Sequence, residues 1–298
     1  MDGATRRADE LRPAATTIAA AELDSARFGF HRAHPGRSAK RTFHLTQLVA
    51  FALIATAAVW AFRVAPHITL EAIQVTALII FASAITLRFA AAANLAPLLS
   101  RLAEPAYAPT YTILCPLYRE ANVVADLVAA IDRLDYPKHA LDVKLLVEGD
   151  DVDTLAAALA VSGAAHIEVV IVPATAPRTK PKALNAGLAL ARGDYVVVYD
   201  AEDRPHPQQL SAALAAFEDG GAQIACVQAP LVIDNADASW IARQFAAEYA
   251  ILFREMLPLL ARLKLPLPLG GASNHFRTDV LRAAGTLSTS VKIALRTR

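Results

Sequence analysis

The sequence predicts an α/β protein, with a mostly parallel β-sheet and flanking helices, preceded by two transmembrane helices. After residue 108, short runs rich in β-branched residues alternate with Ala- and Leu-rich runs of helical length, which is the pattern of βαβ units. Before residue 100, two apolar stretches are each long enough to cross a bilayer. The composition agrees, because 55% of the 298 residues are hydrophobic and the mean hydropathy is +0.36.

The first apolar stretch, Leu45–Val64, carries no charge before Arg63, and the second, residues 72–99, carries only Arg88. The basic residues ahead of the first stretch are Arg6, Arg7, Arg12, Arg27, Arg32, Arg37, Lys40 and Arg41. The positive-inside rule therefore places the N-terminus and the later domain in the cytoplasm, with residues 65–71 as a short external turn. We expect a multi-pass protein of the cytoplasmic (inner) membrane, in contact with the bilayer. Two buried helices in a soluble core are the alternative.

The chain divides into four expected parts. They are a basic, disordered cytoplasmic arm at 1–43, a transmembrane hairpin at 44–99, a folded domain at 108–285 and an atypical tail at 286–298. A Pro- and Ala-containing linker at 100–111 joins the hairpin to the domain. The formal net charge of +1 gives no global field that would favour nucleic acid as a partner.

The two cysteines, Cys115 and Cys226, each lie in an apolar, strand-like run. Two isolated cysteines form neither a disulfide framework nor a metal cluster. We expect buried free thiols, which suit a reducing compartment.

Strands and helices are expected to alternate through the folded domain. The expected strands are 112–118, 142–150, 166–175, 194–203 and 222–233. The expected helices are 121–134, 153–163, 181–193 and 207–220. Helical segments of this length between strands predict a parallel sheet that is covered on both faces.

Carboxylates gather where the strand at 194–203 ends, at Asp200, Glu202 and Asp203. In open α/β sheets, ligands bind beyond the carboxyl ends of the strands. Clustered carboxylates repel one another unless a cation lies among them, and hard oxygen ligands suit Mg²⁺ or Mn²⁺. No Walker A or G-x-G-x-x-G loop occurs, so a phosphate would be neutralised by the metal together with Lys180 or Lys182. A solvated acidic turn is the alternative interpretation.

Other strand ends are also polar. Acids of the segment EGDDVDT can accept hydrogen bonds from a ribose or a base, while Asp153 or Thr154 can equally cap the helix that follows. Tyr118 could stack on a nucleobase, although a lone aromatic residue at a strand end is commonly a packing residue. Together these strand ends predict one site at one edge of the sheet.

Four segments carry a resemblance to a known family. They are CPLYREANVVADLVAAIDRLDYP, KLLVEGDD, TKPKALNAGLALARGDYVVVYDAEDRPHPQQL and PLPLGGASNHFRTDVLRAAG. In this order they resemble family 2 glycosyltransferases, most closely the processive, bacterial cellulose-synthase-like branch, over residues 108–285. The resemblance implies a GT-A (Rossmann-like) fold and a membrane enzyme. Its reaction would transfer a sugar, with inversion, from a UDP- or GDP-sugar to a polysaccharide, glycan or lipid-linked acceptor.

The resemblance also implies roles for individual residues. Those expected to bind the nucleotide-sugar are Pro116, Tyr118 and Glu120 around the base, Glu148 and Asp150 at base and ribose, and Lys180 and Asp200 near the diphosphate. Asp200 and Glu202 match the metal-binding D-x-D motif, with Asp203 as a spare ligand and Mg²⁺ or Mn²⁺ as the cofactor. The acceptor candidates are Ser273, Asn274, His275 and Arg277. His275 taken alone is typical of a structural histidine.

The segment at 239–268 is amphipathic and precedes the acceptor candidates. It is expected either to lie along the membrane interface or to pack on the sheet as an ordinary surface helix.

The family's catalytic base, the Asp of a T-E-D motif, has no counterpart in the sequence, and the family's Q-x-x-R-W is missing as well. After Gly285 the chain contains no carboxylate, which predicts a C-terminal truncation near that residue. Three functions remain open. They are a glycosyltransferase, a membrane-anchored nucleotide-sugar-binding remnant without turnover, and a transferase that places sugar on a lipid phosphate.

Overall fold

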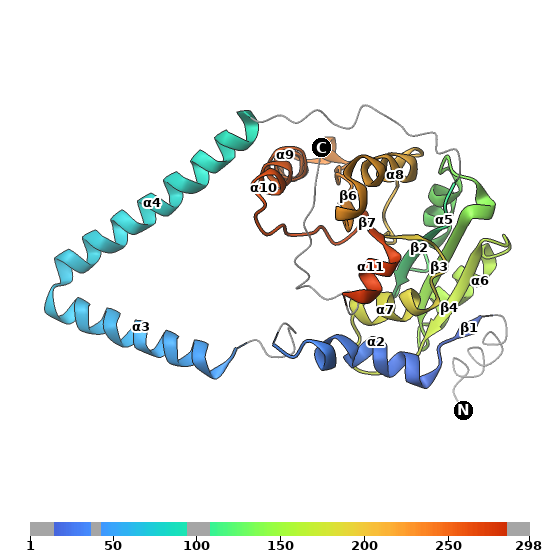
Figure 1. Cartoon of the computed structure of the whole chain (residues 1–298), viewed down its shortest axis with the longest axis horizontal. Helices are drawn as coiled ribbons and strands as arrows, with labels where there is room; N and C mark the ends of the chain where they lie inside the picture. Colours follow the sequence, from blue (N-terminus) through green and yellow to red (C-terminus); the bar gives the residue numbers. More distant parts are fainter. Residues whose placement is uncertain (1–14, 37–42, 94–107, 285–298) are drawn as a thin grey trace.

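A computed structural model describes residues 15–36, 43–93 and 108–284 of the chain. Its centre is a seven-stranded sheet with the order β1-β4-β3-β2-β5-β7-β6 (Figure 1). The strands are β1 (Thr16–Thr17), β2 (Tyr111–Leu117), β3 (Leu141–Glu148), β4 (Ile167–Val172), β5 (Tyr195–Val198), β6 (Cys226–Gln228) and β7 (Asn274–Arg277). Strands β1 to β5 pair in parallel, so the prediction of a mostly parallel α/β sheet is confirmed.

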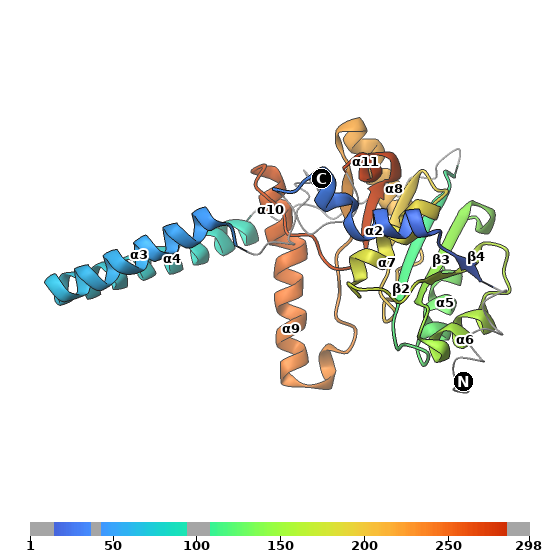
Figure 2. The same ribbon diagram turned by 90° about the horizontal axis from the view of Figure 1, so that it is seen from below.

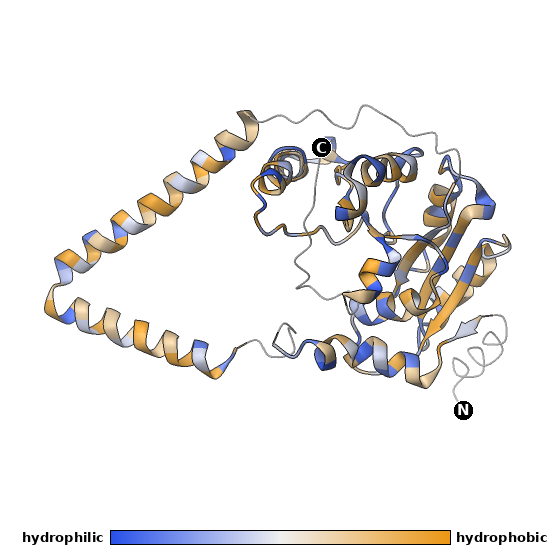
Figure 3. Ribbon diagram, viewed as in Figure 1, coloured by the Kyte–Doolittle hydropathy of each residue, from blue (hydrophilic) through white to orange (hydrophobic). Residues whose placement is uncertain are grey.

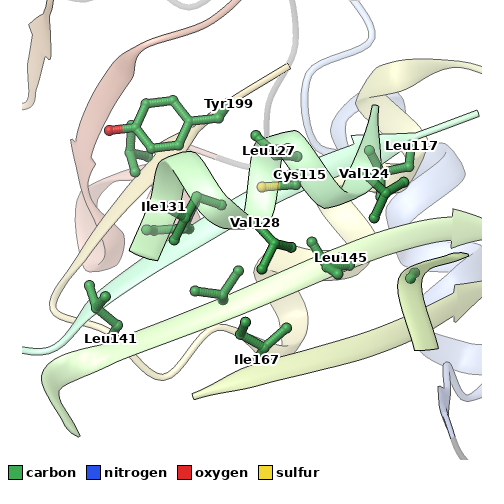
Figure 4. Packing of buried hydrophobic residues seen from close by; sticks show 14 of the residues in the cluster. Cys115, Leu117, Val124, Leu127, Val128, Ile131, Leu141, Leu145, Ile167 and Tyr199 are labelled. Carbon is green, nitrogen blue, oxygen red and sulfur yellow. The ribbon is translucent and has the colours of Figure 1, made fainter. Parts of the chain in front are cut away.

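Helices cover both faces of the sheet, as the alternating sequence predicts. They are α5 (Val124–Asp132), α6 (Val152–Val161) and α8 (Gln209–Gly220) on one face, and α7 (Lys180–Leu190) and α11 (Thr278–Ala283) on the other. Successive side chains of β2 alternate between the faces. Cys115 packs with α5 (Figure 4), while Leu114 packs with α7 on the other face. Cys115 and Cys226 are buried free thiols. A strand buried on both faces must be apolar on both sides, which explains the continuous hydrophobic runs in the sequence.

Within the folded domain, one strand was not predicted. The segment GGASNHFR contains β7, which inserts between β5 and β6 and runs antiparallel to both. Phe276 pairs with Val196 on one side and Cys226 on the other, and it is 2% exposed. Four residues between glycines and a helix give little periodic signal, so only the neighbouring strands reveal this element.

The N-terminal arm differs from the expectation of disorder over residues 16–33. β1 pairs with the edge strand β4, and α2 (Ala20–Ala33) packs on α7 (Figure 2). Ile18, Leu23 and Ala26 are buried there, and Asn185 of α7 donates from Nδ2 to the Ala26 carbonyl at 3.0 Å. The prediction failed because this contact involves only three apolar positions within a basic, polar stretch. Residues 1–14 and 37–42 of the expected arm lie outside the described residues.

Leu23→Asp is expected to release α2 from α7. The substitution removes about 2–3 kcal/mol of apolar burial and places a carboxylate against the α7 face. Limited proteolysis of the detergent-solubilised chain should then cleave the arm faster than in the wild type. Glu22→Ala, at an exposed neighbouring position of the same helix, should leave the cleavage rate unchanged. If the Leu23→Asp and wild-type arms are cleaved at equal rates, the apolar face of α2 that contains Leu23 does not hold this helix on α7.

Two long apolar helices leave the α/β domain as a V, α3 (Leu45–Val64) and α4 (Pro66–Ala93) (Figures 1 and 3). Their mean hydropathies are 1.9 and 2.0, and neither apolar window is buried. Both therefore have the length and composition of membrane spans. The expected external turn at 65–71 is shorter, because α4 already begins at Pro66. Residues 94–107, which include the end of the second expected span and most of the linker, lie outside the described residues, as does the tail at 286–298.

Candidate functional site

The carboxyl ends of β2, β3 and β5, together with the start of α7, surround a cavity of about 320 Å³, here called the strand-end cavity. Its lining residues are Pro116, Leu117, Tyr118, Glu120, Glu148, Arg178, Thr179, Lys180, Ala183, Asp200, Ala201 and Glu202. The volume is at the lower end of the range for small-molecule sites. Parallel strands bring their carboxyl ends to one edge of the sheet, which explains why residues so far apart in sequence meet here.

The wall after β2 is formed by Pro116, Tyr118 and Glu120. The chain turns sharply at Arg119, which has a φ of 59° and whose guanidinium carbon lies 5.1 Å from the centre of the Tyr118 ring. The Glu120 carboxylate accepts a hydrogen bond from the Tyr118 N–H at 3.2 Å. Burial raises the pKa of Glu120, and the charges of Glu202 and Asp200 raise it further. The strand end therefore presents an aromatic ring beside a region of crowded negative charge.

The acids after β3 take different places. Glu148 is 6% exposed and lines the cavity. Asp150 is not a lining residue, but its Oδ2 lies 2.7 Å from Nη1 of Arg178, which is one. The next acid, Asp151, caps α6 by accepting the Thr154 N–H at 3.3 Å. The expected helix cap thus exists, at Asp151 rather than at Asp153 or Thr154.

The acids after β5 form the most negative part of the cavity. Asp200 and Glu202 line it, and the Asp203 carboxylate accepts the Asp200 backbone N–H at 2.8 Å. Burial raises the pKa of Asp203 to about 6, and the charges of Asp200 and Glu202 add to that rise. The backbone hydrogen bond and the Lys180 ammonium oppose it. Three carboxylates crowded around one lysine are a setting in which a further cation binds favourably.

The two lysines of α7 point to different partners. Lys180 donates to Asp200 and, at 2.8 Å, to the carbonyl of Gly271, and it lines the cavity. Lys182 is buried and forms an ion pair with Glu148. Of the two lysines considered for a phosphate, the structure places only Lys180 at the cavity.

Among the described residues, no group of three or more His, Cys, Asp or Glu side chains is arranged to hold a metal. The donor set at the cavity is the pair Asp200 and Glu202, with Asp203 behind them. Mg²⁺ sites commonly use only one or two carboxylates and complete their shell with substrate phosphates. The residues present therefore fit a hard divalent cation that binds together with a phosphorylated ligand.

The acceptor candidates lie in β7 or, for Ser273, directly before it, and they are not among the cavity-lining residues. The Ser273 N–H donates to the Val198 carbonyl at 2.7 Å, which holds this end of the segment near the end of β5. From there β7 leads away from the cavity, because it is antiparallel to β5 and its last residue, Arg277, pairs with Tyr195 at the start of β5. The Arg277 side chain donates to the Ile224 carbonyl at 3.1 Å. Ser273 and Asn274 thus lie at the cavity end of β7, and Arg277 lies at the other.

His275 is completely buried, and its Nδ1 lies 2.7 Å from the Tyr111 hydroxyl. Its other ring nitrogen, Nε2, has no hydrogen-bond partner among the described residues. Burial lowers the pKa of His275 to about 3. The neutral ring packs edge-on against Tyr111, with the ring centres 5.7 Å apart. This is the environment of a structural histidine.

The depressed pKa of His275 predicts acid sensitivity of the fold. Below pH 6.5 the unfolded histidine takes up a proton while the folded one stays neutral, so stability is full above pH 6.5 and declines as the pH falls towards 3. The contribution of His275 should decline by up to about 1.4 kcal/mol per pH unit. Thermal unfolding followed by circular dichroism at pH 7.5, 6.5 and 5.5 measures it.

His275→Gln should flatten the pH dependence of stability between pH 6.5 and 5.5, whereas His139→Gln, at an exposed position, should not. A wild-type slope that persists in His275→Gln would assign the acid sensitivity to another group.

Two polar residues of the cavity wall were not among the predicted site residues. Arg178 and Thr179 line the cavity from the segment between β4 and α7. Arg178 follows a predicted strand and lies two residues before Lys180, so its charge was visible in the sequence. Its place opposite Asp150 was not, because it depends on the path of the intervening loop.

Two proteins of known structure illustrate what this chain is similar to. A mannosyltransferase from Pyrobaculum calidifontis, in complex with GDP-Man and Mn²⁺, is similar, with 24% identity and a TM-score of 0.53, over 74% of this chain and 59% of its own. A glucosyl-3-phosphoglycerate synthase from Mycobacterium tuberculosis, in complex with Mn²⁺, UDP and glucosyl-3-phosphoglycerate, has 22% identity and a TM-score of 0.38, over 58% of each chain. The first of these likenesses supports the fold. This chain spans 59% of the length of that mannosyltransferase.

No protein of curated function matches the sequence. A family comparison matches residues 108–294 to the family described as "Glycosyltransferase like family 2". The match extends past Gly285, where the likeness was expected to stop. It covers most of the chain, including every strand end that lines the cavity. The chain therefore belongs to glycosyltransferase-like family 2, with a GT-A-like fold.

Proposed function

We propose that this chain is a membrane-bound glycosyltransferase that takes a sugar from a nucleoside-diphosphate sugar. The observation that carries the proposal is the strand-end cavity, where the carboxylates of Asp200 and Glu202 lie beside the cations Lys180 and Arg178. A nucleoside diphosphate needs a flat surface for its base, acceptors for its hydroxyls and positive charge for its phosphates. The cavity offers each of these from a different strand end.

Each wall of the cavity suits one part of the donor. The Tyr118 ring and Pro116 offer a surface for the base, with Glu120 beside them. Glu148 offers a carboxylate to the base or ribose, and Asp150 contributes through its ion pair with Arg178. The diphosphate would lie between Arg178, Lys180 and the carboxylates that follow β5.

Asp200 and Glu202 would hold Mg²⁺ or Mn²⁺, with Asp203 as a reserve ligand. When bound, the cation would neutralise the diphosphate and stabilise it as a leaving group. The raised pKa of Asp203, caused by burial and by the charges of its neighbours, supports a cation site here. Lys180, which donates to Asp200, would assist in neutralising the phosphates.

In an inverting transfer, an acceptor hydroxyl oxygen attacks the anomeric carbon, and the bond from that carbon to the diphosphate breaks. The nucleoside diphosphate leaves with the electron pair, and a general base takes the hydroxyl proton. The order of motifs supports a cellulose-synthase-like enzyme with a glycan acceptor. Acceptor entry beside the segment that ends at Ser273 is consistent with the contact between Gly271 and Lys180.

A chain that binds nucleotide without transferring sugar is the second candidate. Incubation of membranes with a radiolabelled UDP- or GDP-sugar separates the candidates. Label in polymer supports the glycan transferase, and label in extractable polyprenyl phosphate supports a lipid-phosphate acceptor. Metal-dependent binding with label in neither fraction supports the binding protein.

The membrane placement is also a proposal, supported by α3 and α4 and by the docked arm. Because β1 pairs with β4, the arm and the catalytic domain must lie on the same side of the bilayer, and two crossings satisfy this. The basic arm places that side in the cytoplasm. A single cysteine introduced by Glu71→Cys should then react with an impermeant maleimide that is added outside right-side-out vesicles. A single cysteine introduced by Glu22→Cys should not react. The reverse labelling pattern would refute the orientation.

The helix α9 (Trp240–Ile251) supports an additional contact with the membrane surface. Trp240, Ile241 and Phe245 are 71%, 61% and 57% exposed. Glu248 on the same helix lies 3.4 Å from Arg88 of α4, so the exposed apolar face adjoins a proposed membrane span. We propose that this face lies in the bilayer interface. The test uses the full-length protein in nanodiscs with Trp60→Phe, which leaves Trp240 as the one tryptophan of the sequence. Brominated lipid should quench the fluorescence of Trp240, and Phe245→Ser should reduce that quenching. No quenching of Trp240 in the chain that keeps Phe245 would refute the interfacial contact.

The proposed donor site is tested by calorimetric titration of UDP and GDP into the detergent-solubilised chain, first with Mn²⁺ and then with EDTA. Binding of one nucleotide that requires Mn²⁺ is expected. Failure of both nucleotides to bind in the presence of Mn²⁺ would refute the donor site.

A further inference from the structure

A buried lysine lies directly behind the strand-end cavity. The Lys182 side chain is 1% exposed, although α7 begins only two residues earlier, at Lys180. Its ammonium lies 2.8 Å from Oε1 and 2.9 Å from Oε2 of Glu148. It also donates to the carbonyls of Pro173 and Thr175, each at 3.1 Å. The ammonium therefore contacts both a cavity carboxylate and the loop that follows β4.

These contacts use the full capacity of the lysine. An ammonium has three N–H donors, and four oxygen atoms surround it here. Lys182 has no donor left for a phosphate and is not a lining residue of the cavity. Its effect on a ligand must pass through the groups that it holds.

Both of those groups lead to the cavity. Glu148 lines it directly, and the loop that contains Pro173 and Thr175 continues to Arg178 and Thr179, which also line it. Without the ammonium, a carboxylate that is 6% exposed would lose its counter-ion, and two loop carbonyls would lose their donor. A buried charge that loses its partner is strongly destabilised and moves or becomes neutral.

Resting on the proposed donor site, we propose that Lys182 is a positioning residue for nucleotide binding. It fixes the Glu148 carboxylate and the loop at 173–179 relative to each other, so that the two sides of the cavity keep the spacing that a nucleoside diphosphate requires. Lys182 acts through these groups and does not touch the ligand.

A second buried lysine provides a matched control. Lys144 on β3 is also 1% exposed and pairs with Asp142 at 2.9 Å and with Glu168. Neither partner lines the cavity. Lys144→Met and Lys182→Met therefore remove the same charge from equally buried positions, but only Lys182 is paired with a residue of the cavity wall.

The test is calorimetric titration of UDP and GDP, with Mn²⁺, into the full chain and its variants. The titrations are done at a temperature at which each variant is folded, as shown by protection of the buried thiols of Cys115 and Cys226 from a maleimide dye. Lys182→Met is expected to weaken binding at least tenfold, which corresponds to about 1.4 kcal/mol. Lys144→Met should stay within about twofold of the wild type, within the additivity error for independent sites.

The double variant Lys182→Met/Glu148→Gln identifies the route of the effect. Its two replacements leave no unpaired buried charge, so it also protects the test against misfolding of the single variant. If Lys182 acts through Glu148, the double variant should bind no more than about twofold more weakly than Lys182→Met, because interacting residues are not additive.

Wild-type affinity in a folded Lys182→Met chain would overturn the positioning role and leave the donor site in place. A double variant that binds much more than twofold more weakly than Lys182→Met, or an equal loss in Lys144→Met, would also overturn it. Absence of nucleotide binding by the wild-type chain would overturn the donor site itself, and the positioning role with it.

Discussion

Asp200→Ala is expected to abolish Mn²⁺-dependent nucleotide binding while leaving the chain folded. Asp200 lines the strand-end cavity and is the first carboxylate after β5, so its loss removes half of the proposed metal ligand pair. The affinity for UDP or GDP in Mn²⁺ should fall about 100-fold or more, the equivalent of roughly 2.7 kcal/mol. The fold should persist, because the partner that Asp200 leaves behind, Lys180, has a side chain that is 35% exposed and can be solvated.

Calorimetry in Mn²⁺ and in EDTA checks this expectation, with circular dichroism to confirm folding. Asp126→Ala is the matched control, since its side chain is 67% exposed and Asp126 is not a lining residue of the cavity. It should bind as the wild type does. Unchanged nucleotide affinity in Asp200→Ala would refute the metal site.

Asp142→Ala is expected to cost about 3–5 kcal/mol of folding stability, the effect of breaking a buried ion pair. The Asp142 side chain is 2% exposed and lies 2.9 Å from the ammonium of the equally buried Lys144. It also accepts hydrogen bonds from the Thr112 hydroxyl at 2.9 Å and from the Arg192 side chain at 2.6 Å. Removing the carboxylate would leave Lys144 with Glu168 as its remaining acidic partner among the described residues.

Thermal unfolding, followed by the reaction of Cys115 and Cys226 with a maleimide dye, measures this loss because both thiols are buried in the folded chain. Arg192→Ala removes the exposed partner of the same carboxylate, with a side chain that is 65% exposed, and should cost no more than about 1 kcal/mol. Equal losses in the two variants would contradict the central role of the buried pair.

The same network makes stability depend on pH. Burial alone would raise the pKa of Asp142, but hydrogen bonds from Lys144 and from the Arg192 backbone outweigh it and hold the pKa below its usual value. Its contribution is therefore present above the unfolded-state pKa and is lost as the pH falls through the lower, folded-state value.

The sequence predicted most of the sheet and most of the cavity wall. Five of the seven strands and the helices between them were expected, because period-2 and period-3.6 hydrophobic patterns are local properties of the chain. The predicted donor residues Pro116, Tyr118, Glu148 and Lys180 meet at the cavity for an equally simple reason. Carboxyl ends of neighbouring parallel strands share one edge, so residues that follow them converge.

Other features could not be predicted, because they depend on contacts between distant residues. The Asn185 side chain contacts Ala26, 159 positions earlier in the chain, and no pattern within either segment indicates the other. Lys180 and Lys182 are indistinguishable by charge and spacing, yet one faces the cavity and the other faces Glu148. The difference arises from the position of each residue on α7 relative to the loop after β4.

The sequence by itself thus determined the βαβ order, the two apolar helices and the strand ends at which charged residues gather. These properties follow from hydrophobic periodicity and from the geometry of parallel sheets, and neither requires knowledge of long-range contacts. The tertiary structure alone decided that β7 enters the sheet between β5 and β6, that α2 packs on α7, and that Lys182 pairs with Glu148. Each of these depends on which buried groups find a partner, because an apolar face, a strand edge or a charge removed from water is stable only against a complementary neighbour.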